Sequence, residues 1–245
     1  QGGRMPLSSE LGAYLRRQID NLHQGRLDAP ELKALVPLAE VQARRSHLPC
    51  ADELLVEYFS SKEGYHLLIY PFEGRFVHEG LAAILAYRLS QRQPLSFSLA
   101  MNDYGLELLS ETEIQLEEAL ADGLFSTTNL SADIVASINA AELACRRFRE
   151  IAGIAGLVFK GYPGKHKRDR HLQASAQLFF SVFEDYEPNN LLLLQAYDEV
   201  MTFQLEEARL RQTLQRIQDL KIVLQRPAKA TPFAFPIMVD RLRGR

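Results

Sequence analysis

The apolar pattern between residues 51 and 72 is typical of β-strands, and this constrains the fold more than any other feature of the sequence. The segments ADELLVEYFSS and GYHLLIYPF are rich in β-branched, aromatic and aliphatic residues. Between them, Ser61-Lys62-Glu63-Gly64 has the composition of a turn. The two segments therefore predict a β-hairpin.

A helix and further strands follow this hairpin. The segment HEGLAAILAYRLSQRQ predicts a helix that stops before Pro94, and LSFSLAMND alternates as a strand. A shorter strand is expected at 104–109. The order strand, strand, helix, strand predicts a mixed sheet. We expect its core to include Leu55, Val56, Leu67, Ile69, Phe97 and Leu99.

The rest of the chain reads mainly as helices. Two are expected near the amino terminus, and Pro37 would kink or divide the second. From about Glu113 onward the pattern is mostly helical, until LKIVLQRP predicts a late strand and FAFPIMVDRLR a terminal helix. A late strand after a helical block usually returns to the existing sheet. We therefore expect one α+β domain over residues 1–245, with a small mixed sheet, a hairpin and one crossover helix in 1–110 and a largely helical half in 111–245.

Composition narrows the class of protein. The net charge of −3 argues against a protein that coats nucleic acid non-specifically, so any DNA contact must be local. Cys50 and Cys145 are far apart in sequence, which predicts neither a disulfide framework nor a zinc site. No apolar run reaches the roughly 18 residues of a membrane span. We expect a cytoplasmic protein without membrane contact, and the initial Gln1 suggests a piece of a longer chain.

Positive charge is concentrated in one segment, KGYPGKHKRDRH, over residues 160–171. Glycines and a proline predict a turn there, and Tyr162 lies within it, flanked by lysines. The segment could hold a DNA backbone beside the start of the next helix, or it could be a solvated connection between helices. The candidate DNA-binding residues are Lys160, Tyr162, Lys165, His166, Lys167, Arg168 and Arg170.

Motifs for catalysis are incomplete. Gly164-Lys165 lacks the first glycine and the final Ser/Thr of a P-loop, since 159 is Phe and 166 is His. His78-Glu79 lacks the second histidine of a zinc-protease helix, since 82 is Ala. An ordinary turn is the favoured interpretation of 102–105, and a solvated helix face that of the acidic stretch 107–122. No catalytic residue and no metal site are expected.

Four segments together carry a family resemblance: YPFEGRFVHEGLAAILAYRLS, SFSLAMNDYGLELLS, FREIAGIAGLVFKGYPGKHKRDRHLQAS and TPFAFPIMVDRLR. They resemble the C-terminal region of bacterial Lhr-type helicases, in the ligase-associated DNA damage response DExH-box group. The resemblance implies a parent that is an ATP-dependent 3′ to 5′ DNA helicase in DNA repair, with two RecA-like motor domains, a winged helix, and ATP and Mg²⁺ as cofactors. It also implies a DNA ligase and an exonuclease in the same pathway.

Walker A and DExH motifs are absent from this sequence, so the resemblance implies a non-catalytic accessory domain that needs no cofactor of its own. Three functions remain open. The domain could help to enclose or guide DNA, with single-stranded DNA as its partner. It could instead be a structural module that packs on the motor domains or self-associates. An independent hydrolase using His78, Asp103 or His166 has little support, because no nucleophile and base stand in a recognisable arrangement.

Overall fold

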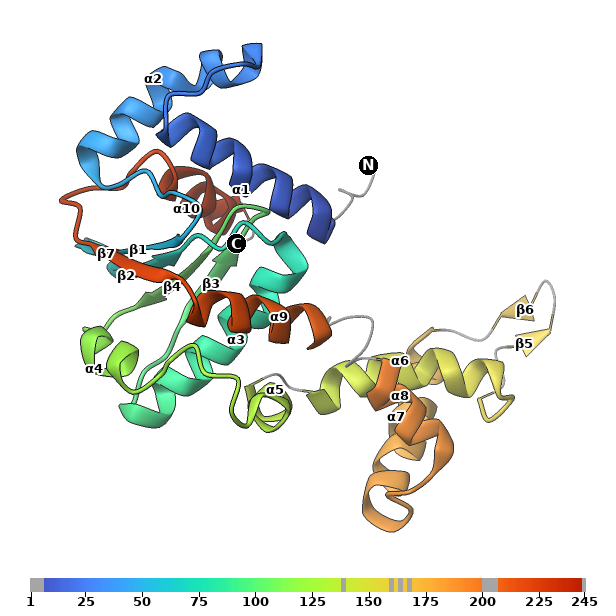
Figure 1. Ribbon diagram of the computed structural model, residues 1–245. Helices are drawn as coiled ribbons and strands as arrows, with labels where there is room; N and C mark the ends of the chain where they lie inside the picture. Colours follow the sequence, from blue (N-terminus) through green and yellow to red (C-terminus); the bar gives the residue numbers. More distant parts are fainter. Residues whose placement is uncertain are drawn as a thin grey trace.

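The computed structural model describes residues 7–137, 140–158, 161–162, 165–166, 169–199 and 207–243. A mixed five-stranded sheet lies in the larger part of the molecule, and a group of helices extends from it (Figure 1). This confirms the predicted α+β class. Within the described ranges, none of the helices combines the length and apolar character that crossing a bilayer requires.

The sheet has the strand order β3-β4-β2-β1-β7. Its strands are β1 (Glu53–Ser61), β2 (Gly64–Ile69), β3 (Ser98–Met101), β4 (Leu106–Ser110) and β7 (Lys221–Gln225). The first two form the predicted hairpin, and β4 and β3 continue the sheet in antiparallel fashion. The late strand β7 runs parallel to β1, as expected for a strand that returns to the sheet.

One face of the sheet packs on α3 (Arg75–Arg92) and α9 (Glu207–Gln218) (Figure 1). The two helices approach closely, since a Cβ built on Gly80 would lie 2.7 Å from Cδ1 of Leu210. A larger residue than glycine at this position would force the Leu210 side chain to shift. Fully buried residues from the strands and α3 on this face include Val56, Leu67, Leu108, Leu81 and Leu85.

The opposite face is covered by α1 (Ser9–His23), α2 (Pro30–Arg45) and the terminal helix α10 (Ala234–Arg243) (Figure 1). The Ser8 hydroxyl caps α1 by accepting a hydrogen bond of 3.3 Å from the Leu11 amide. Side chains of alternate strand residues point to this face, as the two-residue period of a strand requires. They pack with α10 in a second cluster that includes Leu55, Leu68, Tyr70, Ala234 and Ile237.

Between β4 and α9 the chain is helical, with α4 (Leu116–Ala121), α5 (Leu130–Ser137), α6 (Ala140–Ile154), α7 (Asp169–Tyr186) and α8 (Leu191–Glu199). Helices α6, α7 and α8 extend away from the sheet (Figure 1). Their shared core is aromatic: the ring of buried Phe148 lies 5.6 Å from that of Phe180 and 5.9 Å from that of Phe183. Edge-on aromatic packing of this kind stabilises a small helical group.

Two expectations about the core differ from the structure, and of the two effects expected of Pro37 the division of the helix does not occur. Leu99 is 38% exposed, because β3 is the edge strand and only one of its neighbours is a strand. Phe97 packs against the core but precedes β3 and is only partly buried. Helix α2 continues through Pro37 without division. The other four predicted core residues, Leu55, Val56, Leu67 and Ile69, are fully buried.

Truncation of Leu85 tests whether α3 is a core element. Its side chain is fully buried between the sheet and its neighbours. We expect Leu85→Ala to lower the free energy of unfolding by about 2 to 5 kcal/mol, because it removes apolar contacts and leaves a cavity. Urea unfolding measures the loss, with Leu191→Ala as the control because Leu191 is 80% exposed. Equal effects of the two substitutions would contradict the packing.

Candidate nucleic-acid interface

The basic segment forms a short hairpin between α6 and α7, made of β5 (Gly161–Tyr162) and β6 (Lys165–His166). Tyr162 pairs with Lys165 and Gly161 with His166 in antiparallel register. The hairpin lies at the outer side of the helical group, away from the five-stranded sheet (Figure 1). Sequence reasoning expected a turn here and did not predict the strand pairing.

The candidate residues are distributed along this hairpin and the helix that follows. Tyr162 and Lys165 occupy directly opposite positions, and Arg170 lies in the first turn of α7, which begins at Asp169. Lys160, Lys167 and Arg168 lie outside the described residues. The backbone thus brings an aromatic residue and a lysine together beside a helix start, which is a suitable combination for a nucleic-acid backbone and a stacked base.

A second cationic cluster was not predicted from the sequence. Arg16 of α1 and Arg216 of α9 both bind Oε1 of Glu73, with Nη1 of Arg16 at 2.7 Å and Nη2 of Arg216 at 3.1 Å. Nη2 of Arg209 donates to the backbone carbonyl of Glu73 at 2.5 Å. Two arginines therefore share the Glu73 carboxylate, and a third holds its backbone carbonyl, in the loop between β2 and α3.

These arginines also fix the backbone of that loop. Nη1 of Arg16 donates to the carbonyl of Phe72 at 3.1 Å, and Nη2 of Arg216 donates to the carbonyl of Pro71 at 3.0 Å. Phe72 has a φ of 54° and Gly74 a φ of 92°, so the loop adopts a conformation that L-residues rarely take. The cluster joins α1, α9 and the start of α3. Its partners are far apart in sequence, which explains why no local pattern indicates it.

His78 is a buried structural residue rather than a catalytic one. Its Nε2 accepts a hydrogen bond from the Glu73 amide at 3.1 Å, and its Nδ1 donates to the carbonyl of Asn102 at 2.6 Å. Burial lowers its pKa to about 4. Because both ring nitrogens are occupied and the ring is neutral at pH 7, His78 is not available as a base or metal ligand here.

The polar segment 102–105 is a turn, as favoured by its sequence. Oδ1 of Asn102 accepts hydrogen bonds from the amides of Tyr104 at 2.9 Å and Gly105 at 3.0 Å. Oδ1 of Asp103 accepts from the amide of Arg75 at the start of α3, at 3.1 Å. These side chains therefore hold the β3–β4 connection against α3, and with His78 they do not form a hydrolytic site.

Two carboxylates are buried on the sheet face beneath α10. Glu57 accepts hydrogen bonds from Tyr70 and Thr231, both at 2.7 Å, and from Nε2 of Gln42 at 2.9 Å. Burial beside Glu57 raises the pKa of the Tyr70 hydroxyl, which therefore stays protonated as a donor. Thr231 thus has two roles in the terminal TPFAF segment. It donates to Glu57, and it caps α10 by accepting a hydrogen bond from the Ala234 amide.

Glu107 is the second buried carboxylate. It binds Nδ1 of His66 at 2.6 Å and Nε of Arg241 at 2.9 Å, and Arg241 also pairs with Glu63. The expectation that 107–122 forms a solvated acidic face is wrong at this residue, because position 107 lies inside β4. The sequence signal for burial was a carboxylate within an apolar strand. The sequence did not indicate its partner Arg241, because that residue is 134 positions away.

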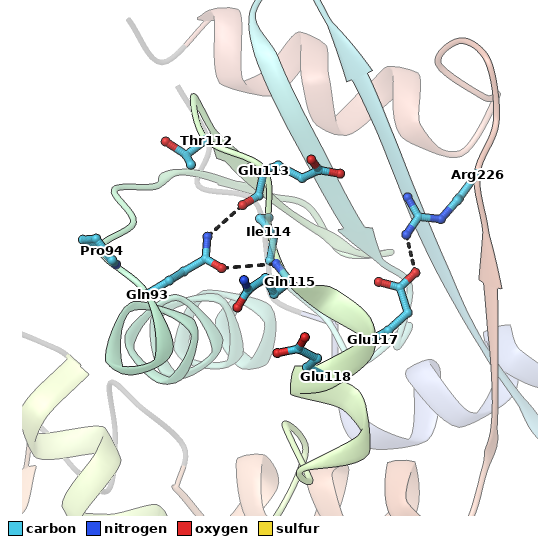
Figure 2. Close-up of a pocket in the computed structure, with 9 residues that line it drawn as sticks. All are labelled: Gln93, Pro94, Thr112, Glu113, Ile114, Gln115, Glu117, Glu118 and Arg226. Carbon is cyan, nitrogen blue, oxygen red and sulfur yellow. Dashed lines mark hydrogen bonds and ion pairs between the residues drawn. The ribbon is translucent and has the colours of Figure 1, made fainter.

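Glu113, Glu117 and Glu118 of the acidic stretch line a pocket of about 560 Å³ beside α4 (Figure 2). Gln93 spans its wall, donating from Nε2 to the Glu113 carbonyl at 2.7 Å, and Glu117 pairs with Arg226. Three carboxylates against one arginine disfavour a phosphate ligand. Among the described residues, no group of His, Cys, Asp and Glu is arranged to hold a metal ion.

Comparisons with known proteins relate this chain to one protein family and to two helicases. The family model described as DEAD/H associated matches residues 48–234. The chain is 26% identical over 216 residues to the ATP-dependent helicase Lhr-Core protein 2 of Thermococcus barophilus, covering 87% of this chain and 25% of that protein. It is 22% identical over 214 residues to the ATP-dependent helicase Lhr-Core of Methanocaldococcus jannaschii, with the same coverage of each. The chain thus spans about a quarter of the length of these curated relatives.

A solved structure shows the same fold. The structure of Mycobacterium smegmatis helicase Lhr bound to ssDNA and AMP-PNP matches with a TM-score of 0.72 and 23% identity, covering 96% of this chain and 32% of that one. Together with the sequence relatives, it confirms the predicted resemblance to Lhr-type helicases.

The buried His78 should make stability depend on pH. Its pKa is about 4 in the folded chain and near 6.5 when unfolded, so the unfolded chain binds more protons between these values. We expect His78 to reduce the free energy of unfolding by about 2 kcal/mol as the pH falls from 7 to 5. Urea unfolding at pH 7, 6 and 5 should show this loss, and a smaller loss in His78→Gln. Equal pH dependence in both proteins would contradict a neutral, buried imidazole.

Proposed function

The chain belongs to the DEAD/H associated family, and we propose that it is the non-catalytic domain of an Lhr-type ATP-dependent DNA helicase that helps to enclose or guide single-stranded DNA. The two sequence relatives are ATP-dependent helicases, and the chain aligns with a quarter of each. The Mycobacterium smegmatis helicase was solved with ssDNA and AMP-PNP bound. These relationships support a role beside motor domains, which would supply the ATP and Mg²⁺ chemistry.

The observation that carries the DNA role is the β5–β6 hairpin. A chain with a net charge of −3 concentrates five Lys and Arg residues between 160 and 170, where Asp169 is the single acid. The hairpin and the start of α7 bring this segment to the outer side of the helical group (Figure 1). Local cationic charge of this kind attracts phosphates without making the whole surface bind nucleic acid.

The acidic pocket beside α4 also favours DNA binding at the hairpin rather than elsewhere on the surface. Glu113, Glu117 and Glu118 line it, and carboxylates repel a phosphate backbone (Figure 2). A DNA strand would therefore avoid this part of the surface and meet the hairpin instead. The wider context is also proposed: 3′ to 5′ movement by two motor domains and a winged helix, and DNA repair together with a ligase and an exonuclease.

A structural role is the second candidate, and exposed apolar residues favour it. In the helical group, Leu178, Tyr186 and Leu191 are 65%, 79% and 80% exposed. Large exposed apolar side chains that gather on one part of a surface often mark a protein interface. The domain could then act by packing on other domains or on itself, with no direct DNA contact.

Removal of the hairpin charges tests the DNA role. We expect replacement of Lys165, Lys167, Arg168 and Arg170 by Ala to weaken binding of single-stranded DNA to a similar degree across sequences, because phosphates carry no base identity. The slope of log affinity against log salt should flatten by nearly 3, at about 0.7 for each lost phosphate contact. Fluorescence anisotropy at several salt concentrations measures both quantities.

A matched variant controls for net charge. It replaces two lysines and two arginines that are exposed on other elements, Lys33, Lys62, Arg17 and Arg44. It should change the slope far less than the hairpin variant. An unaltered affinity and slope in a folded hairpin variant would identify the segment as a solvated connection and favour the structural role.

Tyr162 tests base stacking separately from charge. If its ring stacks on a base, Tyr162→Ala should weaken DNA binding by roughly 1 to 3 kcal/mol and leave the salt slope nearly unchanged. Tyr162→Phe serves as the conservative control, because it keeps the ring and removes the hydroxyl. Equal loss in the Ala and Phe variants would rule out stacking as the source of the effect.

A further inference from the structure

Three side chains near the β1–β2 turn form a continuous chain of hydrogen bonds. Oγ of Ser61 lies 2.7 Å from Nε2 of His66, and Nδ1 of His66 lies 2.6 Å from Oε1 of Glu107. Ser61 is the last residue of β1, while His66 lies in β2 and Glu107 in β4. A hydroxyl, an imidazole and a carboxylate in this order form the arrangement that activates a serine as a nucleophile for acyl transfer.

The register of the sheet brings these three residues together. Phe59 pairs directly with His66, and Ser61 lies two positions further along β1, so its side chain is on the same face. On the other side, His66 pairs with Leu109, and Glu107 lies two positions from Leu109. Strand pairing rather than proximity in sequence therefore assembles the chain of hydrogen bonds, since Glu107 is 41 positions from His66.

The position of the imidazole proton follows from the partners of the ring. Oε2 of Glu107 accepts a hydrogen bond from Nε of Arg241 at 2.9 Å, so the carboxylate is an acceptor at both oxygens. Nδ1 of His66 therefore carries the proton and donates it to Glu107. Nε2 then has a free lone pair and accepts the hydrogen bond of the Ser61 hydroxyl. This is the tautomer that a general base for Ser61 requires.

The base is buried beneath an exposed nucleophile. The side chains of His66 and Glu107 are 0% exposed, whereas Ser61 is an exposed residue. The ring of Phe59 stacks on the imidazole with the ring centroids 4.7 Å apart, which holds the orientation of the base. The Glu63 amide donates to Oγ of Ser61 at 3.0 Å. This N–H would stabilise the negative charge that develops on Oγ, and one lone pair of Oγ remains for attack.

We propose that Ser61 is a modification site, a nucleophile that accepts an acyl group from an activated ester or thioester. Oγ of Ser61 attacks the carbonyl carbon, and Nε2 of His66 takes the hydroxyl proton. A bond forms between Oγ and the carbonyl carbon, and the bond from that carbon to the leaving oxygen or sulfur breaks. His66 returns the proton to the leaving group. The products are an acylated Ser61 and a free alcohol or thiol, so no oxidant or reductant is needed.

The position of Ser61 limits the class of acyl donor. It lies at a turn on the surface, so a donor reaches it without entering a closed cavity. An activated donor is required, because a general base contributes only about 10² to 10⁴-fold to the rate. Each chain reacts once and keeps the acyl group, so the site goes beyond the proposed DNA role without making the domain an enzyme.

Reaction of the folded chain with p-nitrophenyl acetate, and separately with a fluorophosphonate probe, tests the site. Each reagent forms a bond to an activated serine oxygen and releases a good leaving group, p-nitrophenolate or fluoride. Peptide mapping by mass spectrometry locates the modified residue. We expect Ser61 to react about 10²-fold faster than Ser60, as general-base activation predicts. Equal rates at the two serines, or no modification of Ser61, would overturn the proposal.

Ser60 is the matched control within the same strand. It is also exposed, but it is one position from Ser61, so its side chain points to the opposite face of the sheet, away from His66. Ser61→Ala should abolish the fast modification, whereas Ser60→Ala should leave its rate within about twofold of the unaltered chain. Fast modification that persists in Ser61→Ala, or that is lost in Ser60→Ala, would contradict the assignment to Ser61.

The role of His66 is tested by substitution and by unfolding. His66→Gln keeps a hydrogen-bonding side chain but removes the base, so it should slow the reaction of Ser61 by about 10²-fold, to the rate of Ser60. Circular dichroism establishes whether this variant folds. Urea unfolding of the unaltered chain gives the same test without a substitution, since Ser61 should then react no faster than Ser60. An unchanged rate in folded His66→Gln, or a preference for Ser61 that survives in urea, would overturn activation by His66.

Discussion

Burial of two carboxylates on one face of the sheet is the constraint on which the rest of the structure depends. Glu57 and Glu107 are both fully buried, so each requires hydrogen-bond donors in the folded chain. Those donors come from α2, from neighbouring strands and above all from the C-terminal segment, through Thr231 and Arg241. An apolar residue at either position would pack without selecting a partner. The carboxylates instead specify where the terminal segment binds.

The proposed DNA role rests on separation of charge rather than on net charge. The hairpin and the start of α7 hold the basic segment, while carboxylates line the pocket beside α4 (Figure 2). Phosphates would be attracted to the first surface and repelled from the second. In an Lhr-type helicase, such an arrangement would orient the strand on the domain, while the motor domains would supply the movement.

Much of the fold could be predicted because its signals are local. The β1–β2 hairpin, α3 and the returning strand β7 each follow from periodicity and turn residues within a short segment. Leu99 was predicted wrongly because periodicity does not show that β3 lies at the sheet edge. The hairpin β5–β6 was missed because its strands are two residues long and lack the apolar alternation that marks a strand. The cluster at Glu73 joins Arg16 to Arg216, and no short-range pattern connects them.

The strand order has a consequence for the synthesis of the chain. A ribosome releases β1, β2, β3 and β4 before the helical group, and β7 only after it, yet β7 is the neighbour of β1. The edge of β1 therefore has no strand partner from this sheet until residues 221–225 emerge. The hydrogen bonds that Thr231 donates to Glu57 and Arg241 donates to Glu107 form only after still later residues have emerged. Domains tend to fold as units as they leave the ribosome, and unpaired strand edges favour aggregation. Completion of this sheet is thus deferred until the segment 221–241 emerges. A nascent chain interrupted after the helical group would expose a sheet edge, and each of the two carboxylates would lack the partner that this segment supplies.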